Sequence, residues 1–445
     1  MKRAMKCPIL LGVALAFASC STALPGDDPP LIVDMSLPPS CPQAFATRLT
    51  LFTRETIAWV NAVAVRPDGR FVFAGGSSFA EPEAGFSYNY WSGAVDTRGA
   101  LAWSGKDNWS PNRHAILRQS ARSLVLLDDG STVIAGTQED GLRLSRRAAD
   151  GKVLWTHTWS GPGVVDEQFG VARVAEGAYV VVGSHGDPNS GKTTAFVRRV
   201  DDKGQQAWAL DLPVGFASRG RAVAHFANGS VAVTGIVTAD ANATKGKPFL
   251  ALVDGAGHLV WHRTYDLTSA TGGTALLAMA DGGVALVGSV IGGSRSDGLF
   301  LRTDAGGQVV WQRTFGGSED DTLWAIAPLD SAFPGGIGFA LLGQTASMGA
   351  GDQDVWLLRT DDSGRLAWQH TYGEKFWDVG YSVAPLPRST PGGAGFLLGG
   401  SLSVPDQSER ADAWLARTNE NGDVICGDSC VYSHVTRACV PDGGM

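Results

Sequence analysis

The chain has 445 residues, a formal net charge of −8, and a composition of 44% apolar, 9% aromatic and 18% charged residues. So apolar a composition excludes an intrinsically disordered chain. The negative charge, without any basic block, argues against nucleic acid as a partner. The 58 glycines favour a turn-rich, all-β protein with a hydrophobic core.

The first segment of the chain has the features of an export signal. Lys2, Arg3 and Lys6 precede an apolar stretch over residues 8–17, which is too short to span a bilayer. Residues 1–19 are therefore predicted to be a signal peptide that the mature protein lacks. Their removal deletes three positive charges and no negative one, so the net charge falls from −8 to about −11.

The end of this segment reads Phe17-Ala18-Ser19-Cys20 and resembles the bacterial lipobox, in which small residues precede a cysteine that becomes the lipidated N-terminus. The resemblance implies lipid attachment at Cys20, and Ser21 after it implies sorting to the outer membrane. We expect an outer-membrane lipoprotein of the cell envelope that contacts the membrane through its N-terminal lipid only. Ordinary cleavage after Ala18 is the alternative, and it would give a soluble periplasmic or secreted protein.

Residues 20–47 are predicted to be a lipidated cysteine followed by a tether. They contain six prolines and acidic residues at positions 27, 28 and 34, a composition that stays extended rather than packing into a core. A polyproline helix advances about 3.1 Å per residue. This segment is therefore long enough to hold a domain several tens of ångströms from a lipid surface.

An internal repeat fills the next part of the chain. A tryptophan follows a glycine by four residues six times, and the copy that starts at Gly422 ends in Cys426 instead. The spacing of 50 to 57 residues fits a four-stranded unit repeated around an axis better than a helical repeat. The six tryptophans are Trp103, Trp155, Trp208, Trp261, Trp311 and Trp368.

Each repeat unit is predicted to contain four short antiparallel strands. In the unit that begins at Trp311, β-branched, aromatic and other apolar residues typical of strands form four runs, over residues 309–315, 324–329, 338–343 and 354–360. The Gly335-Gly336 turn has counterparts in six other units. Residues 48–425 are therefore expected to form an all-β, seven-bladed β-propeller of four-stranded antiparallel blades.

Both ends of this region offer a strand that would close the ring. Leu49 to Phe52 occupies the place of a first tryptophan strand, and Asp423 to Cys426 is an extra copy with no blade after it. One of the two is expected to complete the last blade, because a closed ring leaves no exposed sheet edge. The sequence leaves open which of them does so.

Residues 426–445 are predicted to be a cysteine-containing tail. If Cys20 carries lipid, an even set of cysteines is left in the mature chain, which two disulfides would satisfy in an oxidising compartment: Cys41, Cys426, Cys430 and Cys439. Such disulfides would clasp the two ends of the ring, and their pairing is open. Three thiols without Cys-x-x-Cys spacing are a poor set of zinc ligands.

The repeated tryptophans have a structural interpretation. A large flat side chain at the same place in every blade is expected to wedge between neighbouring sheets, where it buries about 150 to 250 Å². Stacking on a sugar or aromatic ligand is the alternative, but regularly repeated positions usually serve the repeat itself.

The glycine and tryptophan pattern resembles the tryptophan-docking motif of quinoprotein-like propellers. A closer likeness is to bacterial repeat proteins of the SBBP and delta-60 type, whose units read Trp, Thr, aromatic, a Gly pair, Asp, and a further Asp before the fourth strand. The likeness spans residues 49–426 and implies the propeller fold, with little about activity. The residues that carry it are Thr314-Phe315-Gly316-Gly317, Thr371-Tyr372-Gly373, Asp297, Asp354 and Asp412.

Motifs of nucleotide and metal enzymes are out of place or absent. Gly186 to Thr193 matches the phosphate-loop pattern, but residues 194–200 after it have the pattern of a strand, whereas a phosphate loop leads into a helix. The histidines that follow three blade tryptophans belong to different blades and lack the spacing of zinc ligands: His157, His262 and His370. No Gly-x-Ser-x-Gly elbow is present.

The acidic clusters are expected to be solvated charge. Glu319-Asp320-Asp321 and Asp352 with Asp354 lack the ligand spacing of a recognised calcium loop. We therefore predict no catalytic residue, no cofactor and no metal.

The two faces of the ring are expected to differ. Because strands alternate in direction, the long connections of every blade emerge on one face and the tight glycine turns on the other. The long-loop face collects aromatic and acidic residues typical of a recognition surface: Tyr88, Tyr90, Trp109, Asp166, Asp320, Asp321, Trp377 and Asp378. Ordinary variable loops without a binding role are the alternative interpretation of the same residues.

We expect a monomeric, non-enzymatic binding or scaffolding propeller for an envelope or extracellular protein, or for a glycan. The alternative is a propeller enzyme of the polysaccharide lyase or glycosidase type. That alternative requires acids or histidines from several blades to meet in the central channel.

Overall fold

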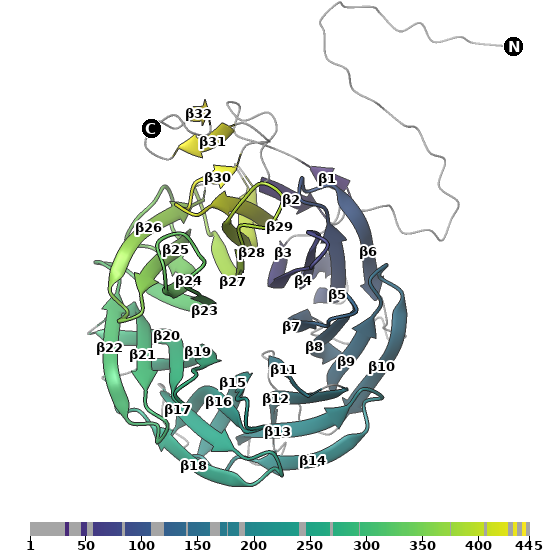
Figure 1. Ribbon diagram of the computed structural model, residues 1–445, viewed down its shortest axis with the longest axis vertical. Coiled ribbons are helices and arrows are strands. Elements are labelled where there is room, and N and C mark those ends of the chain that lie inside the picture. Colours follow the sequence, from purple (N-terminus) through teal and green to yellow (C-terminus); the bar gives the residue numbers. More distant parts are fainter. Residues whose placement is uncertain are drawn as a thin grey trace, which may run out of the picture. The chain divides into compact units, whose positions relative to one another are not determined.

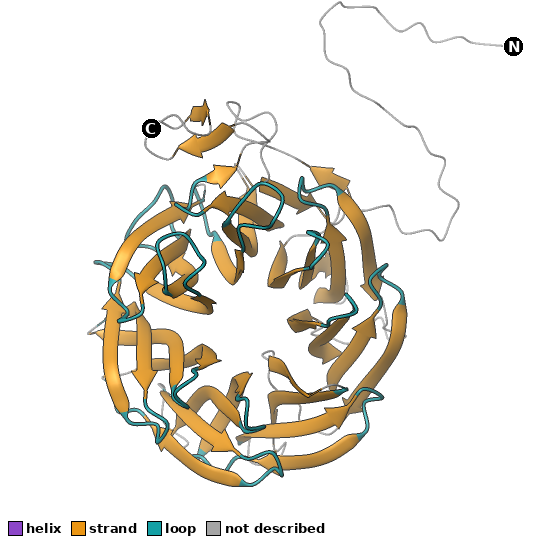
Figure 2. Ribbon diagram, in the orientation of Figure 1, coloured by secondary structure: helices purple, strands orange, loops and turns teal. Residues whose placement is uncertain are grey.

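The structure is a computed structural model of the full chain. Every regular element that it describes is a β-strand, and within the described residues no helix is long and apolar enough to cross a membrane. Strands and connecting loops account for the described part of the molecule (Figure 2). The described residues are 32–34, 46–50, 57–81, 85–107, 120–138, 141–160, 170–175, 177–186, 192–239, 246–267, 270–292, 294–373, 375–404, 407–425, 430–433 and 438–441.

Five sheets have four strands each, paired antiparallel in sequence order. The strands of these sheets are β7 (Ser120–Leu126), β8 (Thr132–Gln138), β9 (Gly141–Arg147) and β10 (Val153–Ser160); β11 (Gly170–Ala175), β12 (Ala178–Gly186), β13 (Thr193–Asp201) and β14 (Gln206–Asp211); β15 (Ala217–His225), β16 (Val231–Thr238), β17 (Lys247–Val253) and β18 (Leu259–Thr264); β19 (Ala270–Ala278), β20 (Val284–Gly292), β21 (Arg295–Thr303) and β22 (Val309–Phe315); β23 (Asp321–Leu329), β24 (Gly338–Thr345), β25 (Asp354–Asp361) and β26 (Leu366–Tyr372).

The sixth sheet has twelve strands and contains elements from both ends of the chain. Its strands pair antiparallel, except for a parallel bridge between Ala411 and Ile57. They are β1 (Ile32–Asp34), β2 (Ala46–Thr50), β3 (Ile57–Val65), β4 (Phe71–Glu81), β5 (Gly85–Val95), β6 (Leu101–Asp107), β27 (Val379–Leu386), β28 (Gly395–Val404), β29 (Gln407–Asn419), β30 (Val424–Ile425), β31 (Cys430–Ser433) and β32 (Ala438–Pro441).

The sheets stand around a common axis (Figure 1). Their innermost strands contact one another in cyclic order, from β3 through β7, β11, β15, β19 and β23 to β27, which again contacts β3. This arrangement confirms the predicted all-β propeller with four-stranded antiparallel sheets. By hydrogen bonding the described strands form six sheets rather than seven, because the bridge between Ala411 and Ile57 joins two runs of strands.

The strand that carries the tryptophan lies at the outer edge of its sheet. β22, with Trp311, pairs with β21 before it and not with β23 after it. The predicted unit, which began with the tryptophan strand, is therefore wrong by one strand. The reason is local: a tight turn at residues 304–308 folds β21 and β22 into a hairpin, whereas a longer connection leads on to the next sheet.

The N-terminal strand closes the ring. β2 pairs antiparallel with β29 over four residues, from Ala46 with Ala416 to Leu49 with Ala413. β30, at the other end of the chain, pairs with β29 only through Val424 and Thr418. The longer pairing therefore joins the two ends of the chain in one sheet.

The hydrophobic core lies between neighbouring sheets. Phe300 of β21 and Phe339 of β24 are buried with their ring centroids 5.2 Å apart in an edge-to-face contact. Leu323, Leu341 and Trp356 belong to the same buried cluster. Burial of each such side chain stabilises the folded protein by about 1.5–3 kcal/mol. The contacts between sheets therefore hold the strands that carry the loops in place.

The repeated tryptophans lie against the turn of the next sheet. The indole N–H of Trp208 donates to the carbonyl oxygen of Gly255 at 3.2 Å, and a Cβ on Gly257 would lie only 2.7 Å from the Trp208 ring. Gly257 also has a φ of 91°, a conformation that favours glycine. The glycine of the motif therefore has two roles. It adopts the positive φ that its own turn requires, and it leaves room for the tryptophan ring of the preceding sheet.

Candidate functional site

The residues predicted for the long-loop face have different surroundings. The Trp377 side chain is 64% exposed, and that of Asp320 is 46% exposed. Asp321 and Asp378 are fully buried. The structure therefore keeps part of the predicted surface and moves two of its acids inside the protein. Trp109 and Asp166 lie outside the described residues, as does the side chain of Tyr88.

Tyr90 is a correction to the predicted surface, since its side chain is 0% exposed. Its hydroxyl lies 3.2 Å from the Ser145 hydroxyl, and the Arg143 guanidinium stands 4.7 Å from the centre of its ring. β5 begins at Gly85, so Tyr90 belongs to a strand instead of a loop. Its side chain faces the neighbouring sheet.

Trp377 is held on a well-bonded segment. Residues 373–378 connect β26 to β27, and their backbone pairs with the loop between β24 and β25. The bonds run from Asp352 N to Lys375 O at 3.2 Å, from Gln353 N to Phe376 O at 3.3 Å and from Asp378 N to Gln353 O at 2.9 Å. The exposed indole is therefore presented in a fixed position.

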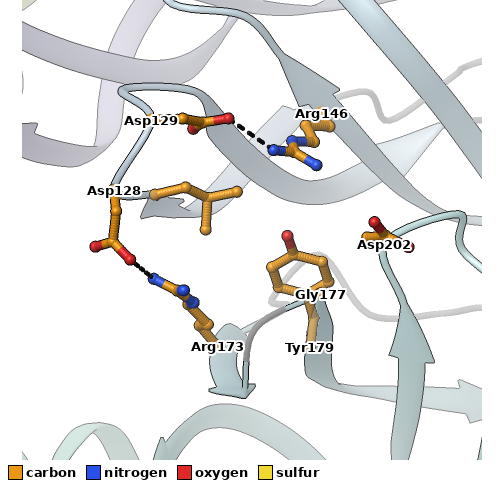
Figure 3. A pocket seen from close by; sticks show the side chains of 8 residues that line it. Asp128, Asp129, Arg146, Arg173, Gly177, Tyr179 and Asp202 are labelled. Atoms are coloured by element: carbon orange, nitrogen blue, oxygen red, sulfur yellow. Dashed lines mark hydrogen bonds and ion pairs between the residues drawn. The ribbon is translucent and has the colours of Figure 1, made fainter.

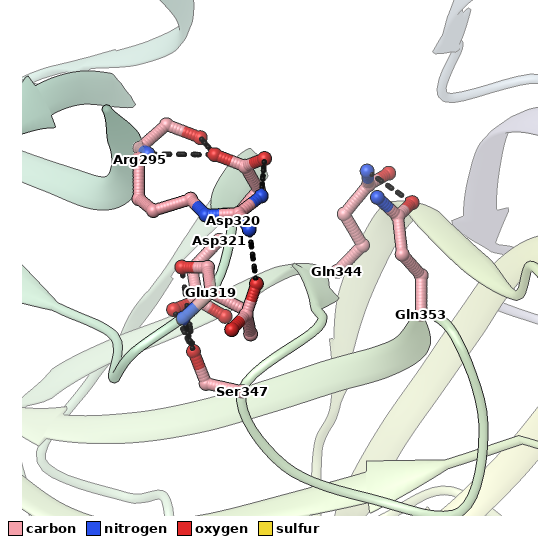
Figure 4. A network of polar contacts seen from close by, with 8 residues as sticks. Arg295, Glu319, Asp320, Asp321, Gln344, Ser347 and Gln353 are labelled. Atoms are coloured by element: carbon pink, nitrogen blue, oxygen red, sulfur yellow. Dashed lines mark hydrogen bonds and ion pairs between the residues drawn. The ribbon is translucent and has the colours of Figure 1, made fainter.

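A charged network lies on the same face (Figure 4). Arg295 of β21 pairs with Glu319 at 2.9 Å and with Asp320 at 3.3 Å. Asp320 also accepts hydrogen bonds from the backbone N–H and the hydroxyl of Ser296. The Ser296 backbone bond is the largest cause that lowers the Asp320 pKa. Exposed pairs of this kind contribute little to stability, and they give the face a rim of both charges.

Two pairs of carboxylates lie behind this rim. Asp297 of β21 and Asp321 of β23 approach the same glycine, Gly316, so closely that a Cβ there would lie under 3.0 Å from both. Burial, and next the charge of Asp321, raise the Asp297 pKa. Asp354 and Asp378 repeat the arrangement around Gly373, with both residues almost fully buried. The prediction of solvated charge is therefore wrong for Asp321 and Asp354.

The innermost strands carry β-bulges that place extra residues beside the axis. Seven such residues have a described side chain, all half-buried: Asn61, Arg122, Val174, Arg221, Thr274, Trp324 and Tyr381. The rings of Trp324 and Tyr381 are 6.2 Å apart. None of these seven is an acid or a histidine, so they supply no group for the predicted glycosidase alternative.

A polar pocket of about 540 Å³ opens among the tight turns of two sheets, β7–β10 and β11–β14 (Figure 3). Arg146 pairs with Asp129 and Arg173 with Asp128, each at 2.8 Å. The pocket is lined by Leu127, Asp128, Asp129, Arg146, Arg173, Gly177, Tyr179 and Asp202.

Two titratable groups of the pocket, Asp129 and Tyr179, have pKa values shifted away from neutral pH. A hydrogen bond from the Ser131 hydroxyl is the largest cause that lowers the Asp129 pKa. Burial raises the Tyr179 pKa above its usual value of 10. Both groups therefore move away from neutrality, whereas an efficient general acid or base has a pKa near the working pH.

Other predicted site residues stay untested. Cys20, Cys41 and Cys426 lie outside the described residues, as do the side chains of Cys430 on β31 and Cys439 on β32. In the phosphate-loop match, residues 187–191 are likewise outside. Thr193 to Asp201 forms β13, as the strand interpretation predicted. In the part of the chain that is described, no group of three or more His, Cys, Asp or Glu side chains is placed to hold a metal.

No model of a protein family matches the chain, and no curated protein does. A solved structure of Drosophila Plexin A in complex with Semaphorin 1b is similar at 9% identity and a TM-score of 0.49, over 87% of this chain and 91% of that chain. The β-propeller domain of the Trilobed protease from Pyrococcus furiosus is similar at 10% identity and a TM-score of 0.37, over 70% and 83%.

Chaetomium thermophilum Sqt1, bound to the N-terminus of ribosomal protein L10, is similar at 13% identity and a TM-score of 0.44, over 82% of this chain and 86% of that chain. At such identities a likeness concerns the fold alone.

Proposed function

We propose that this chain is an outer-membrane lipoprotein whose seven-bladed propeller binds an envelope or extracellular protein, or a glycan, and catalyses no reaction. The observation that carries the binding role is Trp377, the most exposed of the large hydrophobic side chains described. It lies on the face where the long connections emerge.

The count of seven treats the twelve-stranded sheet as two blades. β3 to β6 form one blade, and β27 to β29 form the other with β2 at its outer edge. Support comes from the backbone pairing of β29 with β3, which within the described residues is limited to the single bridge between Ala411 and Ile57. β27 and β3 also contact each other as innermost strands, in the same way as the innermost strands of the other sheets.

The surroundings of Trp377 are those of an anchor in a binding surface. Tryptophan is enriched among the residues that dominate interface energies. Its segment is already fixed by backbone bonds to the loop before β25, so binding orders little of the chain. Arg295, Glu319 and Asp320 supply charges of both signs on the same face, as in the polar rim of an interface.

The test of binding is a comparison of variants. Glycan arrays and capture from solubilised envelope should return ligands that Trp377→Ala binds at least tenfold more weakly, the loss expected for a central anchor. Val310→Ala is the matched control, because Val310 is 60% exposed on β22, at the outer edge of its sheet. Equal loss in both variants would contradict the role of Trp377, and turnover of a polysaccharide by the purified protein would contradict the non-enzymatic role.

The membrane anchor rests on the sequence around Cys20 and has its own test. The mature protein should begin at Cys20 with acyl chains attached and should fractionate with the outer membrane. Cys20→Ser should leave it without lipid. Mass spectrometry of the N-terminal peptide decides the matter, since a mature chain that begins after Ala18 would contradict the lipoprotein.

A further inference from the structure

A chain of side-chain hydrogen bonds leads from the innermost strand β23 to the segment that carries Trp377. The indole N–H of Trp324 on β23 donates to Oε1 of Gln344 on β24 at 3.1 Å. The side-chain amide of Gln344 donates in turn to Oε1 of Gln353 at 2.7 Å (Figure 4). Gln353 forms a parallel backbone bridge with Trp377. The chain therefore joins a bulged residue beside the axis to the backbone neighbour of the exposed indole.

The direction of this chain is fixed at its inner end. An indole N–H can only donate a hydrogen bond, so the amide oxygen of Gln344, and not its nitrogen, faces Trp324. The Gln344 nitrogen then faces Gln353 and takes up the oxygen of that side chain. In the part of the chain that the structure describes, the Gln353 nitrogen has no hydrogen-bond partner. Gln353 is half-buried and therefore offers two N–H donors to a ligand.

Aromatic rings lie at both ends of the chain. Trp377 is 64% exposed at the outer end. At the inner end, the half-buried rings of Trp324 and Tyr381 lie 6.2 Å apart. Burial raises the pKa of Tyr381 above its usual value of 10, so its hydroxyl stays protonated at neutral pH and can donate as well as accept. Ring faces and neutral hydrogen-bonding groups thus occur together on the long-loop face.

The chemistry of this aromatic–amide row fits a sugar chain. A sugar ring has C–H groups on one face, which pack against the electron-rich face of an aromatic ring, and oxygen acceptors at its edge for amide N–H donors. Aliphatic side chains of a protein partner would cover the rings but leave the Gln353 donors unpaired, which is unfavourable. No member of the row is charged, so an acidic sugar gains no counter-charge from it. The row consists of Trp324, Gln344, Gln353, Trp377 and Tyr381.

We propose that the aromatic–amide row binds a neutral oligosaccharide. Sugar rings stack on Trp377 and on Trp324, and the Gln353 amide donates to an oxygen atom of the sugar chain. Because two glutamine side chains connect the positions of the two indoles, the ligand is a chain of several sugars and not a single one. This inference rests on the binding role proposed above for Trp377 and assigns its ligand to one chemical class.

Isothermal titration of the full protein with neutral hexasaccharides tests the proposal. The probes are chains of glucose, mannose, xylose or N-acetylglucosamine. At least one of them should bind, at least tenfold more tightly than its own monosaccharide. Gln353→Glu should weaken this binding at least tenfold, because the carboxylate still accepts from Gln344 but replaces the two N–H donors by an acceptor.

Gln369→Glu is the matched control. Gln369 also accepts an indole N–H, from Trp356 at 3.1 Å, but it lies on β26 at the outer edge of its sheet. This variant should bind the hexasaccharide as wild type does. Equal binding by Gln353→Glu and Gln369→Glu would overturn the proposal.

A second outcome separates this inference from the binding role on which it rests. If every hexasaccharide fails to bind at about 5 mM, while an envelope protein binds wild type and not Trp377→Ala, the glycan assignment is overturned and the role of Trp377 remains. If neither a hexasaccharide nor an envelope protein binds, both proposals are contradicted.

Discussion

Neighbouring sheets are joined by different side chains in different parts of the ring. A serine hydroxyl lies at the junction before β15, whereas aspartates lie at the junctions before β23 and β27. Ser218 lies three residues before the bulged residue of β15, as Asp321 and Asp378 do in β23 and before β27. The Ser218 hydroxyl accepts the backbone N–H of Ala195 at 3.0 Å, across the same kind of junction. A neutral hydroxyl is therefore enough to join two sheets there.

Two further positions of the repeat also differ between the neutral junction and the two charged junctions. Thr194 stands fourteen residues before its repeated tryptophan, where the later repeats have Asp297 and Asp354. Pro213 stands five residues after that tryptophan, where the later repeats have Gly316 and Gly373. A glycine thus occupies this position in the two junctions where a pair of carboxylates meets. In the junction without such a pair, a proline replaces it. The fold therefore accepts a serine hydroxyl at a junction where the later repeats have a pair of aspartates.

The largest expected effect comes from moving an acid into the neutral junction. Ser218→Asp places a buried charge beside the backbone of Ala195. We expect a loss of about 3 kcal/mol in the free energy of unfolding, because an unpaired charge is buried. Urea unfolding at pH 7 measures it.

Ser218→Ala separates this charge effect from the loss of a hydrogen bond. It leaves the Ala195 N–H unpaired and should cost about 1 kcal/mol. A Ser218→Asp loss no larger than that of Ser218→Ala would contradict the contrast between the two kinds of junction.

A methyl group at the meeting point of two carboxylates should have the next largest effect. Gly373→Ala places a Cβ under 3.0 Å from oxygens of Asp354 and Asp378. Because both acids are held by hydrogen bonds, we expect a loss of about 1–3 kcal/mol in the free energy of unfolding, as for other overpacked positions. Pro213→Ala, at the corresponding place in the neutral junction, should change stability by much less. Denaturant unfolding of the two variants checks this, and equal losses would contradict it.

The fold was predictable to the extent that it depends on the repeat. The spacing of the tryptophans and the glycine turns predicts an all-β propeller and separates a tight-turn face from a long-loop face. The sheet predicted for the tryptophan strand was wrong. The lengths of the connections before and after Trp311, and not the repeat period, decide which strand it pairs with. Tyr90 lies in a strand rather than in the predicted loop because β4 and β5 have eleven residues each, more than the strands predicted for the repeat that begins at Trp311.

The pairs of aspartates and the polar pocket were harder to predict from the sequence than the fold. Asp297 and Asp321 are far apart in the chain and lie in different sheets, so their approach depends on how those sheets pack. A usable signal did exist, since each pair has one aspartate fourteen residues before a repeated tryptophan and one ten residues after it. The pocket around Asp128 and Arg173 joins turns of two sheets and has no such repeated signal.

The smallest expected effect is the change with pH in the contribution of Asp297 to the free energy of unfolding. It compares the neutral and charged forms of this side chain directly. Burial and the charge of Asp321 raise the pKa of Asp297 in the folded protein above its usual value of 3.8. The folded state therefore binds this proton more tightly than the unfolded state does. The group should therefore favour folding at low pH, and this contribution should disappear as the pH rises from 3.8 through the raised pKa.

Asp297→Asn removes the titration while keeping the shape of the side chain. The free energy of unfolding of the variant relative to wild type should increase as the pH rises through that window, since the variant escapes the repulsion from Asp321. Parallel stability curves for the two proteins across this range would show that Asp297 and Asp321 do not interact, and the charged junction would then be equivalent to the neutral one.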